Sequence, residues 1–268
     1  MRGWRIVRAI ALRDLRLLVA NKTTAIPMAV MPLIIFAGLP LLVGLVPSAM
    51  NLPGDDLGIL VDAMPESEAA KLPTAPDARL AALFLGYLFA PMFLLVPLML
   101  SIVAAAGSIA GERERRTLET LLLSPATDRQ LFLAKTVGAW VPAVVVTFAG
   151  AIVYQAVANQ VLADSGFRPF PNATWTLLII WVSPALAAAT LGVVVTISAR
   201  SRTYEGALQA GGLLVLPLIA VLIAQATGLM FLGPLSVAAA GALLWGLAGL
   251  LLPRGARAMR RDNLTARL

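Results

Sequence analysis

The feature that most constrains this chain is a series of long stretches without a charged residue. No Asp, Glu, Lys or Arg occurs in residues 23–54, 80–111, 136–163, 169–199 or 206–253. A hydrocarbon core about 30 Å thick needs roughly 20 apolar residues of helix to cross it. Only 13% of all residues are charged, whereas soluble domains carry about 25%. We therefore expect an all-α polytopic membrane protein.

The last uncharged stretch must contain two spans. It is 48 residues long, and a single helix of that length would measure about 70 Å, more than the bilayer can cover. Gly228, Gly233 and Pro234 mark the expected break, since Gly and Pro interrupt helices. The sequence thus predicts one transmembrane domain, residues 1–268, with spans at 24–46, 80–110, 131–160, 174–198, 206–227 and 233–253.

The basic residues indicate how these six spans are oriented. Of the 21 Lys and Arg residues, 18 lie on the side that holds both termini, and three lie in outer segments: Lys71, Arg79 and Arg168. The positive-inside rule then predicts an integral plasma (inner) membrane protein with both termini, and the tail 254–268, in the cytoplasm. The loop 47–79, which is mostly acidic among its charges, is expected outside. Topology explains the net charge of +7, and we expect no nucleic-acid partner.

Residues 1–22 form a basic segment before the first span. Arginines recur from position 2 to position 16 without an uninterrupted apolar centre, which is not typical of a cleaved signal peptide. At about 100° per residue, Arg5, Arg13 and Arg16 share one face and apolar residues group on the other. The segment is either a basic flank that sets orientation or, as we favour, an amphipathic interfacial helix along the inner leaflet.

Several classes of chemistry are excluded by residues that the chain lacks. It has no His and no Cys, so we expect no catalytic, cofactor-binding or metal-binding residue built on them. The uncharged stretches also lack the ionisable group that ion-coupled carriers place near the midplane. Most neutral polar residues in the spans are expected to join helices, and four are candidates for a substrate path: Ser101, Thr147, Gln155 and Gln209.

Residues 112–124 have the pattern of a short amphipathic helix between spans two and three. Opposite charges fall at i,i+3 and i,i+4, and leucines form one stripe: Glu112, Arg115, Arg116 and Glu119, with Leu118, Leu121 and Leu122. Ser124-Pro125 ends this helix, and Asp128 is a candidate cap for the next. A helix on lipid headgroups carries a basic polar face, whereas this one mixes Glu and Arg equally, which favours a protein partner.

This stretch resembles the permease subunits of the ABC-2 family of ATP-binding-cassette exporters. That family has a charged end to its second span, a Thr-Leu-Glu-x-Leu-Leu helix, Ser-Pro, and a Lys at the start of its third span. The matching residues here are Glu112, Glu114, Thr117, Leu118, Glu119, Leu121, Leu122, Ser124, Pro125 and Lys135. The resemblance implies that residues 112–124 form a coupling helix that docks on a separate cassette ATPase.

The resemblance also implies the assembly. A pore forms from two six-span halves, so a homodimer with two ATPase copies is the simplest complex, and a heterodimer with a related permease stays open. The chain has no G-x-x-x-x-G-K-[ST] phosphate loop, so ATP and Mg²⁺ are expected on the partner and the chain itself is not expected to be an enzyme. The expected cargo is hydrophobic or amphipathic. The alternatives are an ATPase-independent assembly or structural membrane protein and an ion-coupled secondary carrier.

Overall fold

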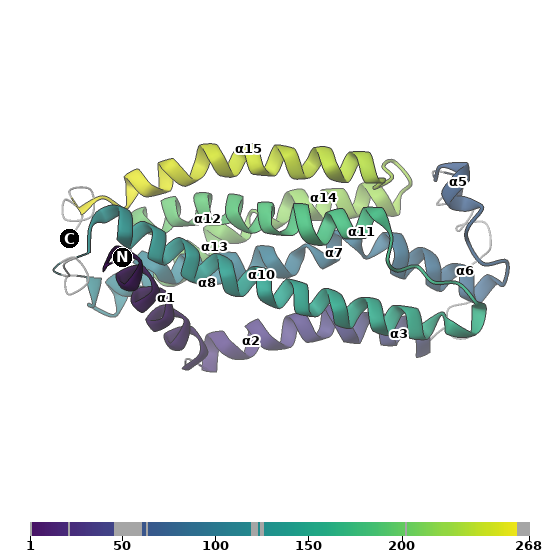
Figure 1. Ribbon diagram of the computed structural model, residues 1–268, viewed down its shortest axis with the longest axis horizontal. Coiled ribbons are helices and arrows are strands. Elements are labelled where there is room, and N and C mark those ends of the chain that lie inside the picture. Colours follow the sequence, from purple (N-terminus) through teal and green to yellow (C-terminus); the bar gives the residue numbers. More distant parts are fainter. Residues whose placement is uncertain are drawn as a thin grey trace.

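The computed structural model describes residues 2–20, 22–45, 61–62, 64–118, 123, 126–201 and 203–261. These residues are almost entirely helical, and the described ranges contain no strand. The helices form one elongated bundle (Figure 1). Helix α1 (Arg2–Ala20) and the last turns of α15 (Pro234–Ala258) lie at one end, which we call the α1 end. Helix α5 (Glu66–Ala69) lies at the opposite end, which we call the α5 end.

Six helical segments within the described ranges are long and apolar enough to cross a membrane. In chain order, spans 1 to 6 are Ala25–Leu45, Ala90–Glu114, Asp128–Val161, Ala173–Arg200, Tyr204–Ala226 and Pro234–Ala258. The prediction of an all-α polytopic membrane protein with six spans is therefore confirmed.

Most spans are built from more than one helix. Span 1 contains α2 (Lys22–Leu33), the π-helix η1 (Ile34–Gly38) and α3 (Leu39–Leu45). Span 2 contains α7 (Ala90–Phe93) and α8 (Leu95–Glu114), and follows α6 (Pro76–Leu83) and the π-helix η2 (Phe84–Leu88). Span 3 is α10 (Asp128–Val161), which the short η3 (Ala163–Ser165) follows. Span 4 contains α11 (Ala173–Leu177), η4 (Leu178–Val182) and α12 (Ser183–Arg200). Span 5 contains α13 (Tyr204–Gly212) and α14 (Val215–Ala226), and span 6 is α15.

The irregular start of span 2 is held by side chains from three other spans. Pro91 has no N–H for the carbonyl of Tyr87, four residues earlier, and Gln225 Nε2 donates to that carbonyl at 2.7 Å. The two preceding carbonyls of η2 accept from Tyr154 Oη at 2.8 Å and from Trp175 Nε1 at 2.7 Å. Neighbouring spans thus donate to three successive carbonyls, and one of these bonds replaces the backbone bond that Pro91 removes.

Spans 2 and 4 form the centre of the bundle, and spans 5 and 6 are the most exposed. In the α5 half, spans 2, 3 and 4 pack large aromatic side chains, among them Phe93, Tyr154 and Trp175. In the α1 half, α8 and α12 bury small and aliphatic residues instead. Ser198 of α12 joins the two helices there, because its hydroxyl donates to the carbonyl of Ala106 at 2.9 Å and accepts the N–H of Ala110 at 3.0 Å.

The helix that begins span 3 differs from the expectation at its first turn. Thr127 is the N-cap: its hydroxyl accepts the N–H of Gln130 at 3.3 Å, and the Gln130 amide oxygen accepts the N–H of Thr127 at 3.0 Å. This reciprocal pair is a capping box. The expectation that Asp128 caps the helix is therefore wrong, and its carboxylate pairs with Arg261 at 3.2 Å.

The end of span 2 also differs from the sequence-based bounds. Residues 112–114 are the last three residues of α8, not the start of a separate helix over 112–124. The helix continues past the uncharged stretch because its last turn is held by neighbours, as Glu112 pairs with Lys135 and Arg113 donates to the carbonyl of Ser201. Residues 119–122, 124 and 125 of the expected coupling helix lie outside the described residues.

Candidate functional site

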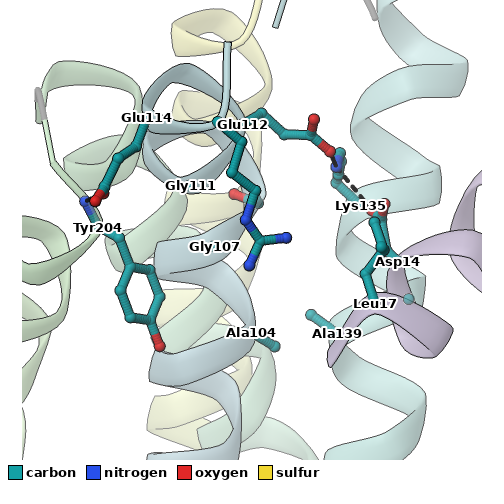
Figure 2. Close-up of a pocket in the computed structure, with 13 residues that line it drawn as sticks. Asp14, Leu17, Ala104, Gly107, Gly111, Glu112, Glu114, Lys135, Ala139 and Tyr204 are labelled. Atoms are coloured by element: carbon teal, nitrogen blue, oxygen red, sulfur yellow. Dashed lines mark hydrogen bonds and ion pairs between the residues drawn. The ribbon is translucent and has the colours of Figure 1, made fainter. Parts of the chain in front are cut away.

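A cavity of about 290 Å³ lies at the α1 end, among α1, α8, α10 and α13 (Figure 2). Its lining is charged toward the ends of the helices and small and apolar toward the middle of the bundle. The charged residues are Asp14, Glu112, Glu114, Arg115 and Lys135, and the small ones are Ala104, Gly107, Ser108, Gly111, Gly138 and Ala139. Leu17 and Tyr204 complete the lining.

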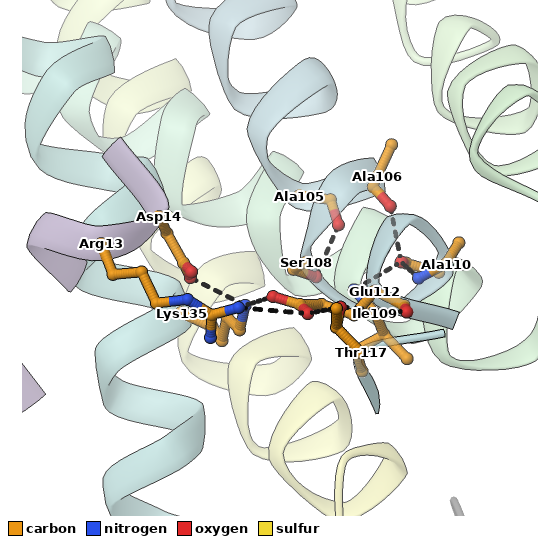
Figure 3. Close-up of polar contacts among 11 residues, drawn as sticks. Arg13, Asp14, Ala105, Ala106, Ser108, Ile109, Ala110, Glu112, Thr117 and Lys135 are labelled. Carbon is orange, nitrogen blue, oxygen red and sulfur yellow. Dashed lines mark hydrogen bonds and ion pairs between the residues drawn. The ribbon is translucent and has the colours of Figure 1, made fainter. Parts of the chain in front are cut away.

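One wall of the cavity is a group of ionised side chains centred on Lys135. The ammonium lies 2.8 Å from Asp14 Oδ2 and 3.1 Å from Glu112 Oε1 (Figure 3). Arg13 Nη2 lies 3.7 Å from Glu112 Oε2. We call Arg13, Asp14, Glu112 and Lys135 the charge cluster. The Lys135 side chain is 2% exposed and that of Glu112 7%, whereas Arg13 is 46% exposed, so the cluster is buried at its centre and open to the surface at Arg13.

Each charge is positioned by the packing of its helix. Asp14 belongs to α1, Glu112 to the last turn of α8 and Lys135 to the start of α10. Helix α1 reaches Lys135 because it crosses α10 at Gly138: a Cβ there would lie 3.2 Å from the Cα of Ala11. Ala11 stands three residues before Asp14, and Gly138 stands three residues after Lys135. The close crossing therefore brings the Asp14 carboxylate and the Lys135 ammonium together.

The cluster contains two positive and two negative groups, so its formal charge is zero. Buried ions lose hydration, and attraction between them compensates only when each keeps its partner. Removing one partner from such a group typically costs about 3–5 kcal/mol, whereas replacing the whole group by packed apolar side chains is often neutral. The three helices are therefore tied together at this point, and a change in the position of one is opposed by the other two.

The chain turns sharply at Arg116, just after the end of α8. Arg116 adopts a left-handed backbone conformation, with φ of 57°, and the N–H of Thr117 donates to the carbonyl of Glu112 at 2.9 Å. The Thr117 hydroxyl donates to the Glu112 carboxylate. Leu118 is then buried, 2% exposed, among residues of α8, α10 and α12. Glu112, the first residue of the segment 112–124, thus bonds both to Lys135 of the charge cluster and to Thr117 further along the segment.

The end of α8 also holds the start of span 5. Glu114 Oε2 accepts the N–H of Tyr204, the first residue of α13, at 2.9 Å. Thr203 caps the same helix, since its hydroxyl accepts the N–H of Gly206 at 3.2 Å. Four helices, α1, α8, α10 and α13, therefore meet through polar contacts at one level of the bundle.

The structure brings together some of the predicted site residues and separates others. Glu112, Thr117 and Arg13 meet at the charge cluster, and Glu114 lies beside it on the cavity wall. Leu118, expected on a surface for the partner, lies inside the chain's own core because the turn at Arg116 directs it there. Arg5 and Arg16 are exposed on α1. Glu119, Leu121, Leu122, Ser124 and Pro125 lie outside the described residues.

The four candidates for a substrate path lie away from the lining of this cavity. Ser101 and Thr147 are fully buried, and the Thr147 hydroxyl donates to the carbonyl of Ala143 in its own helix at 2.7 Å. Gln155 is partly buried, Gln209 is exposed, and none of these four described residues lines the cavity. A hydroxyl that bonds back to its own helix is a common structural role for Ser and Thr.

Two important residues were not among the predicted site residues. Asp14 is the only acidic residue among residues 1–54, so it interrupts an otherwise basic segment, and that exception is a usable signal. Lys135 stands at the start of span 3 and appeared only as part of the family pattern. Leu123 is 86% exposed, and Leu121 and Leu122 lie outside the described residues.

The fold and the site define the class of this protein: an integral membrane protein of six helical spans, with a buried charge cluster where the segment between spans 2 and 3 begins. The profile of a family described as ABC-2 family transporter protein matches residues 8–240. The chain belongs to this family, and is a permease component of an ABC transporter that associates with an ATP-binding-cassette subunit. A search of curated proteins gives no match to this chain.

Proposed function

We propose that the chain is the permease half of an exporter, driven by a separate cassette ATPase that docks at the α1 end. The observation that carries this proposal is the Lys135 ammonium, which binds Asp14 of α1 and Glu112 of α8 at 2.8 and 3.1 Å. Glu112 is also the residue to which Thr117 bonds as the chain enters the segment 112–124. A force on that segment therefore reaches three helices through one carboxylate.

The partner surface in this proposal is the tip of the segment between spans 2 and 3. Leu123 is exposed there, whereas Leu118 is buried in the permease. In this proposal the exposed Leu123 side chain is the apolar group that fills a pocket of the ATPase. Leu121 and Leu122 remain part of the proposed contact by their sequence pattern. ATP and Mg²⁺ would be held by the partner, and the chain itself is not proposed to be an enzyme.

The proposed orientation places the α1 end in the cytoplasm and the protein in the plasma (inner) membrane. The basic residues support it, because 18 of 21 fall in segments on that side. We propose a homodimer with two ATPase copies, in which lipid or the second copy covers the exposed spans 5 and 6. We propose a hydrophobic or amphipathic cargo, since the spans are aliphatic.

The test of the proposed function is reconstitution with the cassette subunit. The permease alone should hydrolyse no ATP, and co-expression should yield a complex with two copies of each chain. Replacing Leu121 and Leu122 together with Asp should abolish binding of the ATPase and transport, because unpaired carboxylates are costly at an interface. Glu66→Lys, a charge change at the α5 end, is the control that should leave both intact. Normal transport by the double variant would contradict docking at this segment.

Cysteine labelling tests the orientation, because the native sequence contains no cysteine that would react. Asp164 and Arg260 are both exposed, and lie after span 3 and after span 6. A cysteine at position 164 should react with a membrane-impermeant maleimide on intact cells. A cysteine at position 260 should react only after permeabilisation. The reverse pattern would invert the orientation and move the proposed ATPase site to the wrong side.

A further inference from the structure

The cavity at the α1 end has the depth and polarity of an amphiphile site. Ala104 and Glu114 both line it, and Glu114 stands ten positions after Ala104 in α8, which is about 15 Å along the helix axis. Its charged residues lie near the end of α8 and the starts of α10 and α13. Its floor, which we define as Ala104, Gly107 and Ala139, lies toward the middle of the spans. A volume of about 290 Å³ is close to the lower limit of ordinary ligand pockets.

The charge cluster leaves hydrogen-bonding capacity unused on this cavity. Asp14 Oδ1 is buried and has no hydrogen-bond partner among the residues that the structure describes. The Lys135 ammonium has three N–H groups, and its contacts with Asp14 and Glu112 account for two of them. A buried carboxylate oxygen without a donor is unfavourable, so the site favours a ligand that supplies an N–H or O–H.

A positive group faces the same cavity from the end of α8. Arg115 lines the cavity and is exposed, and within the described ranges it makes no ion pair. Its guanidinium can bind a phosphate with two parallel hydrogen bonds. The lining therefore offers an anionic acceptor at Asp14 and a cationic donor at Arg115.

The floor of the cavity is shaped by residues without side-chain bulk. A Cβ built on Gly107 would have only the ring of Tyr204 within 4 Å, at 3.9 Å, so this position has open space beside it. Gly111 has the same neighbour at the same distance. Leu17 of α1, itself exposed, provides an apolar border. A ligand with a polar head in the cavity therefore has room for an apolar tail beside these glycines and Leu17.

We propose that the cavity binds the head of a lipid-like amphiphile that carries both a primary ammonium and a phosphate. The ammonium donates to Asp14 Oδ1, the phosphate meets Arg115, and the acyl chains extend along Leu17 into the hydrocarbon. A purely anionic head would face three carboxylates, and a purely cationic head would face Lys135 and Arg115. That this amphiphile is also the exported cargo rests on the proposed function, whereas its binding does not.

The test is binding of fluorescent-chain lipids to the purified permease in detergent, without the ATPase. The probes are phosphatidylethanolamine, phosphatidylglycerol with the same chains, which lacks the ammonium, and a long-chain alkylamine, which lacks the phosphate. Phosphatidylethanolamine should bind saturably and roughly tenfold more tightly than either of the others, because phosphatidylglycerol offers Asp14 only a neutral hydroxyl donor and the alkylamine offers Arg115 no phosphate. Equal affinity for all three probes would overturn the proposal.

Soluble glycerophosphoethanolamine separates a lipid from a free head compound as the ligand. It has the same two charged groups and no acyl chain, so it should compete at least a hundredfold more weakly than the lipid. Competition at equal concentration would show that a water-soluble compound fills the site, and would overturn the assignment to an amphiphile.

Three variants locate the binding in this cavity. Gly107→Leu fills the floor without touching a charge and should lower phosphatidylethanolamine affinity at least tenfold, as should Arg115→Gln. Gly246→Leu is the matched control, because no atom lies within 4 Å of a Cβ at that position of α15, and it should bind normally. Unchanged affinity in both Gly107→Leu and Arg115→Gln would overturn the proposal. Lipid binding without any ATPase association would leave the site standing and reject the proposed function.

Discussion

At the scale of single residues, a side chain of another span supplies the hydrogen bond that Pro91 removes. Pro91 leaves the carbonyl of Tyr87 without its helical donor, and Gln225 of span 5 donates instead at 2.7 Å. The ring of Tyr87 also packs against Phe231, with centroids 5.5 Å apart. Spans 2 and 5 are thereby joined at the α5 end, beside the turn at 227–233 that leads into span 6.

Replacing Gln225 by Leu should lower the free energy of unfolding by about 1–2 kcal/mol, because the Tyr87 carbonyl loses its donor in an apolar setting. Adding Pro91→Ala to the same chain restores an N–H at position 91 and should recover most of that loss. Thermal unfolding in detergent measures both. A double variant no more stable than Gln225→Leu alone would show that this hydrogen bond does not hold the two spans together.

The segment before span 2 is sensitive to pH through Glu68. Its hydrogen bond with Lys71 lowers the pKa of the Glu68 carboxyl below its ordinary value, and Tyr87 Oη donates to the same group at 3.1 Å. A lowered folded-state pKa means that the contact stabilises the fold above the ordinary Glu pKa, about 4.3, and that the contribution is lost as pH falls through the lowered value.

Below pH 4, the backbone amides of Lys71 and Leu72 should therefore exchange hydrogen faster than the intrinsic rate change explains. Both donate to carbonyls of α5, at 3.2 Å. Glu68→Gln keeps the shape but not the charge, so its protection should be weaker at neutral pH and should not change further on acidification. Identical pH profiles in the two proteins would contradict a role for the ionised carboxylate.

At the scale of helices, close approach depends on glycine at the contact. Span 1 crosses span 3 where the ring of Phe36 lies over Gly150, and a Cβ at that position would be 1.8 Å from a ring carbon. Phe36 is itself buried and contacts Phe93 with ring centroids 5.1 Å apart. The ring has little room to move, so the glycine fixes the distance between the two spans.

Gly150→Ala should destabilise the protein by about 1–3 kcal/mol, the usual result of overpacking a buried contact. Gly249→Ala is the control, since a Cβ there meets no atom within 4 Å, and it should be neutral or slightly stabilising. Phe36→Leu combined with Gly150→Ala should recover stability, because the smaller side chain leaves space. Equal unfolding temperatures for Gly150→Ala and Gly249→Ala would contradict the close crossing.

The sequence predicted elements more reliably than contacts between them. Uncharged stretches and the distribution of Lys and Arg were sufficient for six spans, because membrane insertion depends on hydropathy along the chain. The capping box at Thr127 and Gln130 was readable as Thr-x-x-Gln and was missed in favour of Asp128. The π-helix at the start of span 2 was not readable, because three other spans stabilise it.

The candidate site shows the same limit. Glu112 and Arg13 were identified by local pattern and Thr117 by the family resemblance, but their meeting with Asp14 and Lys135 depends on how α1 crosses α10 at Gly138. Helical periodicity placed Leu118 on the stripe with Leu121 and Leu122. The left-handed residue Arg116 breaks that periodicity, and Leu118 turns into the core.

At the scale of the whole molecule, α10 connects the two ends of the bundle (Figure 1). Its 34 residues extend about 51 Å, which exceeds the hydrocarbon thickness of about 30 Å. Lys135 near its start belongs to the charge cluster, and Tyr154 near its end is buried among aromatic rings and bonds to η2. We infer that a displacement at the α1 end is carried along α10 to the opposite side.

The charge cluster can be tested separately for stability and for coupling. Lys135→Met alone leaves Asp14 without its ionic partner and Glu112 with only the exposed Arg13, and should lower the free energy of unfolding by about 3–5 kcal/mol. Combining Lys135→Met with Asp14→Leu and Glu112→Leu removes every unpaired charge at that centre except the exposed Arg13. That triple variant should recover stability, because apolar replacement of a buried ionic group is often neutral.

The ratio of cargo moved to ATP hydrolysed, measured for the triple variant with its cassette partner in proteoliposomes, tests the central claim most directly. Thermal unfolding and ATPase binding on the same preparation establish that the complex is intact. The predicted result is a stable complex that hydrolyses ATP while its transport per ATP falls at least tenfold, because the carboxylate that links residues 112–124 to three helices is gone. A stable triple variant with the wild-type ratio would contradict the account.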